Sequence, residues 1–298
     1  MRAAMRLVGY LTALALVFGA SWQVGTGLGR PAPVVVVGEP AAAPPVVPPP
    51  SFSPAPDPGE GQLGLAATAA GYTLVLPNAT FTPGKAGELA FTIGGPDGRP
   101  VTAFAPTDER PIHVVVVRRD AAGYQRLQPA LGSDGRWRTP LVLPAAGVYR
   151  LYVEFVPLAG PALVLGTDLF GPGDFGPIPF SPNRVVQIDG YQVRLDGDLV
   201  PGSPSQVFAT ISRNGAPVTD LQPFLGSFGH LLALRRNDLA FLRFQPDAAP
   251  PATADRSGPG IAFTARVPTA GSYRLFLDFR HGVGVHTAEF TVDTRDGS

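Results

Sequence analysis

Ile-His-Val-Val-Val-Val-Arg-Arg, at residues 112–119, returns as Gly-His-Leu-Leu-Ala-Leu-Arg-Arg at residues 229–236. His113 and His230 hold the same position in the two stretches, and subtracting their numbers gives an offset of 117. Such a continuous apolar run that starts with a histidine and ends in two arginines is typical of a buried strand. The recurrence predicts that the chain contains two copies of one module.

The match extends well beyond this strand. The Gln-Pro pairs at residues 128–129 and 245–246 keep the offset of 117. Pro-Ala-Ala-Gly-Val-Tyr-Arg-Leu at residues 144–151 then matches Pro-Thr-Ala-Gly-Ser-Tyr-Arg-Leu at residues 268–275, where the offset is 124. One loop of the second copy is therefore seven residues longer.

The composition favours short strands and turns. The 298 residues include 36 glycines and 35 prolines, which disfavour long helices and predict an all-β chain. The 23 basic and 23 acidic residues balance without a long run of one sign, so no nucleic-acid partner is expected. Cysteine is absent, which excludes a disulfide framework and thiolate metal ligands.

Each module contains a series of short segments with strand-like patterns, separated by turn-forming residues. Residues 149–155 alternate apolar and polar side chains, which predicts a half-buried strand with one face in water. The strands predicted in the first module are Tyr72 to Leu76, Gly87 to Ile93, Ile112 to Arg119, Tyr124 to Leu127, Arg136 to Leu143 and Val148 to Phe155. Those predicted in the second are Tyr191 to Leu195, Gln206 to Arg213, His230 to Arg235, Leu239 to Phe244, Ile261 to Val267, Ser272 to Phe279 and His286 to Val292.

These strand lengths predict two tandem β-sandwich modules, immunoglobulin-like or cupredoxin-like. We place the first module at residues 64–185, with residues 159–185 forming its end and an ordered linker. The second module is placed at residues 186–294, followed by a tail at residues 295–298.

The N-terminus has the pattern of a membrane-targeting segment. Arg2 and Arg6 precede an uncharged apolar stretch, so we expect a signal anchor or signal peptide at residues 1–25. Residues 26–63 form a linker rich in proline and alanine, which favours an extended conformation. The positive-inside rule then predicts a single-pass membrane protein whose modules lie outside the cytoplasm. A secreted protein is the alternative.

No motif predicts catalysis. The chain has no nucleophile elbow, phosphate-binding loop or dinucleotide fingerprint, and its carboxylates are scattered. We therefore predict that the protein is not an enzyme, with an unrecognised hydrolase as the remaining alternative.

The four histidines are the candidate functional residues. His113 and His230 begin equivalent strands, where each can hold a strand edge by a hydrogen bond or can ligate a metal. His281 and His286 lie on either side of a predicted hairpin turn, so their rings can converge. Together with His230 they would supply three nitrogens to Cu(II) or Zn(II), whereas an exposed hairpin without a metal is the alternative.

Residues 111–120 and 220–231 resemble a family of actinobacterial, membrane-anchored, two-module exported proteins labelled heavy-metal-binding. Their modules are similar to YtkA-like β-sandwich domains. The resemblance covers about residues 71–292 and the layout of anchor and linker. It implies a non-catalytic, extracytoplasmic protein that binds or handles a heavy metal, copper above all.

In that family a His-x-His-Pro segment follows each strand that starts with the conserved histidine. Here Arg-Leu-Gln-Pro at residues 126–129 and Arg-Phe-Gln-Pro at residues 243–246 replace it, and a guanidinium has no lone pair for a metal. His113, His230 and His281 are the positions that match the family. The alternative function is a structural or protein-interaction scaffold with a decayed metal site. Its paired arginines at residues 118–119 and 235–236 would be available to an acidic partner.

Overall fold

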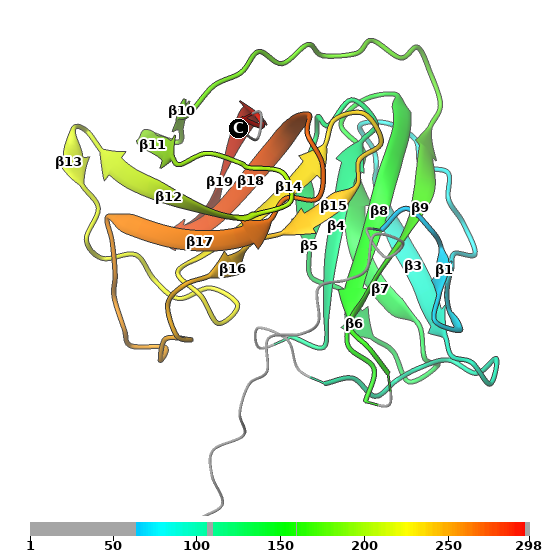
Figure 1. Ribbon diagram of the computed structural model, residues 1–298. Helices are drawn as coiled ribbons and strands as arrows, with labels where there is room; N and C mark the ends of the chain where they lie inside the picture. Colours follow the sequence, from blue (N-terminus) through cyan, green and yellow to red (C-terminus); the bar gives the residue numbers. More distant parts are fainter. Residues whose placement is uncertain (1–63, 106–109, 159, 296–298) are drawn as a thin grey trace, which may run out of the picture. The chain divides into compact units, whose positions relative to one another are not determined.

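The computed structural model describes residues 64–105, 110–158 and 160–295. Within these ranges the chain forms strands and turns but no helix, which confirms the predicted all-β class (Figure 1). Accordingly, none of the described residues forms a helix that could span a membrane. The predicted anchor at residues 1–25, the linker at residues 26–63 and all but the first residue of the predicted tail lie outside the described ranges.

The first module is a sandwich of two antiparallel sheets. Its strands are β1 (Thr68–Ala69), β2 (Tyr72–Val75), β3 (Ala86–Gly94), β4 (Ile112–Arg118), β5 (Gln125–Leu127), β6 (Ala130–Leu131), β7 (Trp137–Val142), β8 (Gly147–Phe155) and β9 (Leu163–Gly171). One sheet has the order β1-β2-β3-β7-β6 and the other β5-β4-β8-β9. Strand β9 pairs with β8 along its whole length, so the end of this module is a full strand that the sequence analysis did not predict.

The second module repeats this arrangement. Its strands are β10 (Val185–Ile188), β11 (Tyr191–Asp196), β12 (Pro204–Arg213), β13 (Ala216–Pro217), β14 (Gly229–Arg235), β15 (Phe241–Arg243), β16 (Gln245–Pro246), β17 (Gly260–Arg266), β18 (Ser272–His281) and β19 (Gly284–Asp293). One sheet has the order β10-β11-β12-β17-β16, with β13 paired to β12, and the other β15-β14-β18-β19. The predicted strand from Leu239 is shorter, because Leu239 adopts a positive φ of 62° in the turn before β15.

Both modules have the strand order of an immunoglobulin-like sandwich. In the first module, strands β2 to β9 correspond in order to strands A, B, C, C′, D, E, F and G of such a sandwich. Strands A, B, E and D then lie in one sheet, and strands C′, C, F and G lie in the other. Each F strand also begins with a tyrosine corner: the Tyr149 hydroxyl donates to the carbonyl of Ala145, and that of Tyr273 to the carbonyl of Thr269, both at 2.8 Å. Of the two predicted architectures, the observed one is therefore immunoglobulin-like.

Each module has its own apolar core between its two sheets. In the first, Phe91 of β3 and Val114 of β4 belong to one buried cluster. In the second, Phe263 of β17 and Leu277 of β18 do the same. Burying one such side chain contributes about 1.5–3 kcal/mol, so each sandwich has a core of its own to stabilise it.

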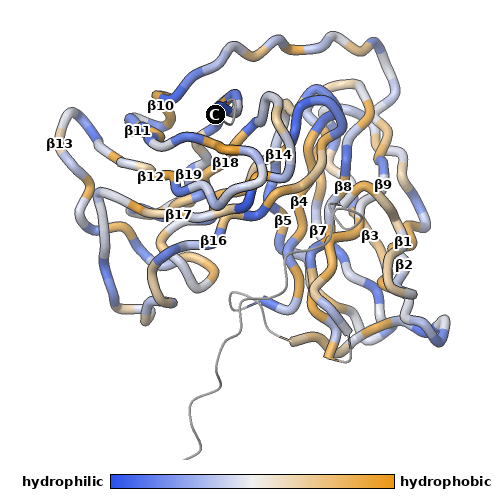
Figure 2. Tube along the Cα trace, in the orientation of Figure 1, coloured by the Kyte–Doolittle hydropathy of each residue, from blue (hydrophilic) through white to orange (hydrophobic). Residues whose placement is uncertain are grey.

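A third apolar cluster joins the modules, which both lie in one compact unit, residues Ser53–Ser298. Successive side chains of a strand point to opposite faces. Val114 therefore lies in the core of the first module, whereas Val115 lies in the third cluster with Leu232 of β14. This double burial explains why β4 and β14 are apolar along their length (Figure 2).

The contact between the modules corrects one expectation. The strand at residues 149–155 does not have a face in water, because Tyr152 is buried in the third cluster and the Glu154 side chain is only 18% exposed. Alternation predicted the polarity of this face correctly. It could not show that a second sheet covers it.

The linker between β9 and β10 connects the two modules (Figure 1), and its residues contact side chains of both. The Arg118 guanidinium lies 5.3 Å from the centre of the Phe175 ring, and the Arg274 guanidinium lies 3.7 Å from that of Phe180. Asp120 accepts a hydrogen bond from the backbone of Ile178 at 2.8 Å. These contacts place linker residues on both modules.

The first arginine of each pair that was expected to be available to an acidic partner is engaged within the chain. Arg118 is buried and forms an ion pair with Asp120 at 2.7 Å, and Arg235 forms one with Asp238 at 2.5 Å. The first arginine of each pair therefore already has an acidic partner within its own module.

Candidate functional site

The two equivalent histidines meet where the modules contact each other. His113 of β4 lies opposite Glu154 of β8, and His230 of β14 lies opposite Asp278 of β18. Both histidines are buried, and their ring centres are 6.5 Å apart. Nε2 of His230 donates to the backbone carbonyl of Phe224 at 2.6 Å. The repeat thus positions a pair of imidazoles between two sheets.

Two ion pairs accompany the histidines. Arg126 Nε lies 2.6 Å from Asp278 Oδ2, and Arg243 Nη1 lies 2.6 Å from Glu154 Oε1. The arginines are 117 residues apart and the carboxylates 124, so they are equivalent positions of the repeat. Each module contributes the arginine of one pair and the carboxylate of the other. The interface therefore has approximate two-fold symmetry.

Aromatic side chains follow the same symmetry. Tyr124 stacks on Phe276 with ring centres 4.3 Å apart, and Phe241 contacts Tyr152 with centres 5.3 Å apart. Tyr124 is equivalent to Phe241, and Tyr152 to Phe276, by the same two offsets. Such pairs contribute about 0.5–1.5 kcal/mol beyond their buried area. We call these four aromatic residues, the two histidines and the two ion pairs the inter-module cluster.

Burial shifts the protonation of the cluster. It lowers the pKa of His230 to about 4, and the nearby charge of Arg126 acts in the same direction. Burial also raises the pKa of Glu154 to about 7, although the charge of Arg126 opposes this shift. The histidine is therefore neutral around pH 7.

Asp278 has the most complete set of partners in the cluster. Besides Arg126, it accepts hydrogen bonds from the hydroxyl of Tyr124 at 2.8 Å and from that of Thr287 at 2.6 Å. Each carboxylate of the cluster thus already receives a bond from an arginine.

The predicted ligands His281 and His286 lie elsewhere. Both contact the ring of Tyr191, with ring centres 5.5 Å and 4.6 Å away. His281 bonds the Tyr191 hydroxyl through Nδ1 and Asp220 through Nε2, at 2.7 Å and 2.9 Å. His286 Nδ1 bonds Asp189 at 2.8 Å.

The pleat of β18 separates His230 from this pair. His230 lies opposite Asp278, which faces the other module, whereas His281 is three residues farther along β18 and points to the opposite face. The residues therefore do not fit the three-histidine copper or zinc site. In the described ranges no group of three or more His, Cys, Asp or Glu side chains is placed to hold a metal ion.

Sequence reasoning missed the charged members of the cluster. The repeated Arg-x-Gln-Pro segments were noticed only for the ligands they lack, yet Arg126 and Arg243 are the cations of the two ion pairs. A usable signal was present in Glu154 and Asp278, which are acidic at equivalent positions of the repeat. An acidic and a basic residue that both recur in a duplicated chain suggest a pairing between the copies.

The fold and the interface define the class of this protein as a tandem of two immunoglobulin-like sandwiches joined through their C′-C-F-G sheets. The chain belongs to the family described as "Domain of unknown function (DUF8832)", which matches residues 67–164 and 185–296. The two matched stretches lie over the two sandwiches. No curated protein matches the chain. The resemblance to YtkA-like heavy-metal-binding proteins stays a prediction.

Several solved structures are similar to this chain at low sequence identity. The Escherichia coli adhesin FdeC is 12% identical, covering 77% of this chain and 66% of its own, with a TM-score of 0.24. A Salmonella alpha-2-macroglobulin is 17% identical, covering 81% and 16%, with a TM-score of 0.23. The D00-D0 domain of intimin is 9% identical, covering 74% and 98%, with a TM-score of 0.20. The chain spans less than two thirds of the first two proteins, and TM-scores this low support no conclusion about function.

Proposed function

We propose that this protein is a non-catalytic scaffold of two rigidly joined immunoglobulin-like modules. The observation that carries the proposal is the approximately two-fold interface with its two ion pairs. The interface also buries an apolar cluster to which both modules contribute. A joint of this kind fixes the two modules in one arrangement, as a scaffold that presents surfaces at a set geometry requires.

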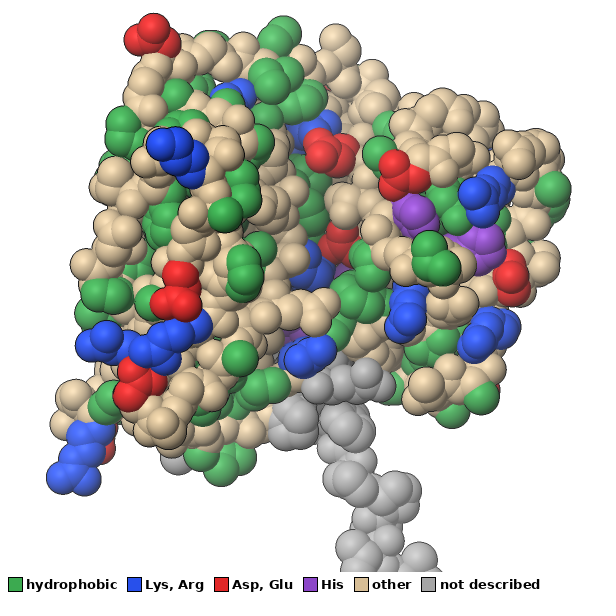
Figure 3. Space-filling model, turned by 180° about the vertical axis from the view of Figure 1, so that it is seen from behind, with side chains coloured by type: hydrophobic (Ala, Val, Ile, Leu, Met, Phe, Trp, Pro, Cys, Tyr) green, Lys and Arg blue, Asp and Glu red, His purple; other side chains and the backbone are tan. Residues whose placement is uncertain are grey.

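The polar groups at the interface support a structural role. A hydrolase needs a free base beside its nucleophile. Nε2 of His230 instead donates to a backbone carbonyl, and the hydroxyl of the nearby Ser227 donates to that of Gly229 at 2.9 Å. The face in Figure 3 carries acidic and basic side chains interspersed, which suits contacts with a protein more than binding to a polyanion.

We further propose that the scaffold is held outside the cytoplasm by residues 1–25. The support is the charge pattern around the apolar stretch, together with the proline-rich spacer behind it. An alkaline phosphatase fused after Ser298 is expected to be active in intact cells and to sediment with membranes. Activity in the medium would indicate a secreted protein, and no activity would overturn the extracytoplasmic placement.

Calorimetric unfolding tests the rigid scaffold. We expect one transition for both modules, with equal calorimetric and van't Hoff enthalpies, because neither module can unfold without exposing the interface. Two separated transitions would refute a rigid joint. Titration of the same sample with Cu(II) and Zn(II) examines the competing function. Stoichiometric binding that disappears in a His281→Ala/His286→Ala variant would favour metal handling over the scaffold.

A further inference from the structure

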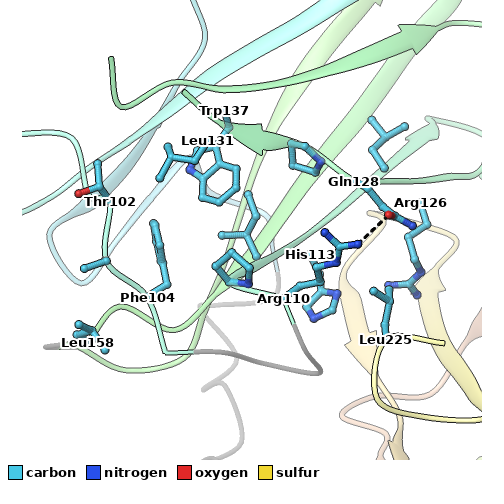
Figure 4. A pocket seen from close by; sticks show the side chains of 15 residues that line it. Thr102, Phe104, Arg110, His113, Arg126, Gln128, Leu131, Trp137, Leu158 and Leu225 are labelled. Carbon is cyan, nitrogen blue, oxygen red and sulfur yellow. Dashed lines mark hydrogen bonds between the residues drawn. The ribbon is translucent and has the colours of Figure 1, made fainter. Parts of the chain in front are cut away.

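A cleft of about 430 Å³ opens in the first module beside the inter-module cluster (Figure 4). This volume falls in the range of about 300–1,000 Å³ that is usual for small-molecule sites. Its lining combines apolar residues such as Phe104, Leu131 and Trp137 with Arg110, His113 and Gln128.

The two ends of the cleft differ in character. Figure 4 shows Trp137, Phe104 and Leu158 at one end and Arg110 with Gln128 at the other. Arg110 donates to Gln128 Oε1 at 3.1 Å and forms no ion pair with any described residue. Among the described residues no aspartate or glutamate lines the cleft, while the second lining arginine, Arg126, pairs with Asp278. Arg110 is therefore the lining cation that can pair with an anion in the cleft.

Trp137 supplies a second, independent observation. The residue is 97% buried and lines one end of the cleft (Figure 4), so it adds an apolar wall there and its emission reports on an occupant.

The second module provides an internal comparison. Trp137 corresponds to Ile261, Phe104 to Leu221 and Arg110 to Ser227, by the offsets of the repeat. All three of these counterparts are buried, and none is charged. The second copy thus fills the equivalent region and lacks the cation, so the cleft is particular to the first copy.

We propose that this cleft binds a small amphiphilic carboxylate. Its apolar body lies against Trp137, Phe104 and Leu131, and its carboxylate pairs with the Arg110 guanidinium. Because most of the lining is apolar, we expect the cleft to prefer ligands whose body is aliphatic or aromatic. The Arg110 cation selects the acid over a neutral analogue of the same length.

Tryptophan fluorescence tests this assignment directly. The chain has two tryptophans, so a Trp22→Phe variant of the full chain leaves Trp137 as the reporter. Titration with decanoate, below its micellar concentration, is expected to give a saturable change in Trp137 emission. Decan-1-ol should bind at least tenfold more weakly. No saturable change, or equal binding of acid and alcohol, would overturn the proposal.

Two substitutions locate the carboxylate and the apolar body. Arg110→Met should weaken decanoate binding at least tenfold and leave decanol binding unchanged, and because Arg110 is exposed the fold should be retained. Leu158→Glu, at a lining residue of the apolar end that is 70% exposed, should weaken decanoate and decanol binding alike, because it puts a charge beside the apolar body. Arg256→Met, in an exposed loop of the second module, is the matched control. Unaltered decanoate binding in both cleft variants would refute the role of Arg110.

Discussion

Arg126→Met is the sharpest test of the interface. The substitution removes the cation that lies 2.6 Å from Asp278, a residue that is 1% exposed. Of the donors given for Asp278 among the described residues, the hydroxyls of Tyr124 and Thr287 would remain. Removing one partner of a buried ion pair typically costs about 3–5 kcal/mol, because the remaining charge stays buried without compensation. We expect a loss of this size in the free energy of unfolding.

Urea unfolding followed by fluorescence measures this loss, and Arg138→Met is the matched control. Arg138 also pairs with an aspartate, Asp134, at 2.6 Å, but the two side chains are 35% and 46% exposed. Water screens such a pair, so its removal should cost no more than about 1 kcal/mol. If Arg126→Met and Arg138→Met destabilised the protein equally, the argument that the interface depends on a buried ion pair would be refuted.

Two further predictions concern the same interface. Between about pH 4 and 6.5 the unfolded chain binds more protons at His230 than the folded protein does, so this residue makes stability rise with pH. Between about pH 4.5 and 7 the folded protein binds more protons at Glu154 than the unfolded chain does, so this residue makes stability fall with pH. These two effects oppose each other in the wild type. As the pH rises through these windows, the stability of His230→Gln should therefore fall by about 3 kcal/mol relative to the wild type, and that of Glu154→Gln should rise by about 3 kcal/mol relative to it. Urea unfolding at several pH values measures both, and curves of stability against pH that run parallel to that of the wild type would contradict this prediction. Phe276→Ala should cost about 3–5 kcal/mol, because Phe276 is fully buried against Tyr124, and Phe208→Ala, at a residue 43% exposed, should cost far less in thermal unfolding.

Much of the fold could be predicted because it depends on local patterns. Glycine and proline content indicated short strands, and the observed β4 and β14 begin at or next to the predicted residues Ile112 and His230. Strand β9 was not predicted because residues 159–185 contain many glycines and prolines, which favour a module end and a linker. Its pairing with β8 supplies the order that its own sequence does not indicate.

The candidate site was predictable only in part. The equivalence of His113 and His230 indicated a shared role, and the structure does bring their rings together. The grouping of His230 with His281 was based on nearness in the sequence. The structure puts the two residues on opposite faces, because a three-residue step along a strand leads to the other face of the sheet.

By itself, the sequence determined that this protein is all-β, that it is duplicated and that its equivalent residues recur at offsets of 117 and 124. These properties follow from composition and internal repetition, which need no knowledge of contacts. Only the tertiary structure decided that the two C′-C-F-G sheets face each other and that Arg126 pairs with Asp278 of the other module. Sheet packing is a contact between residues about 150 positions apart. Whether a polar strand face meets water or a second sheet depends on that contact and not on the strand's own pattern.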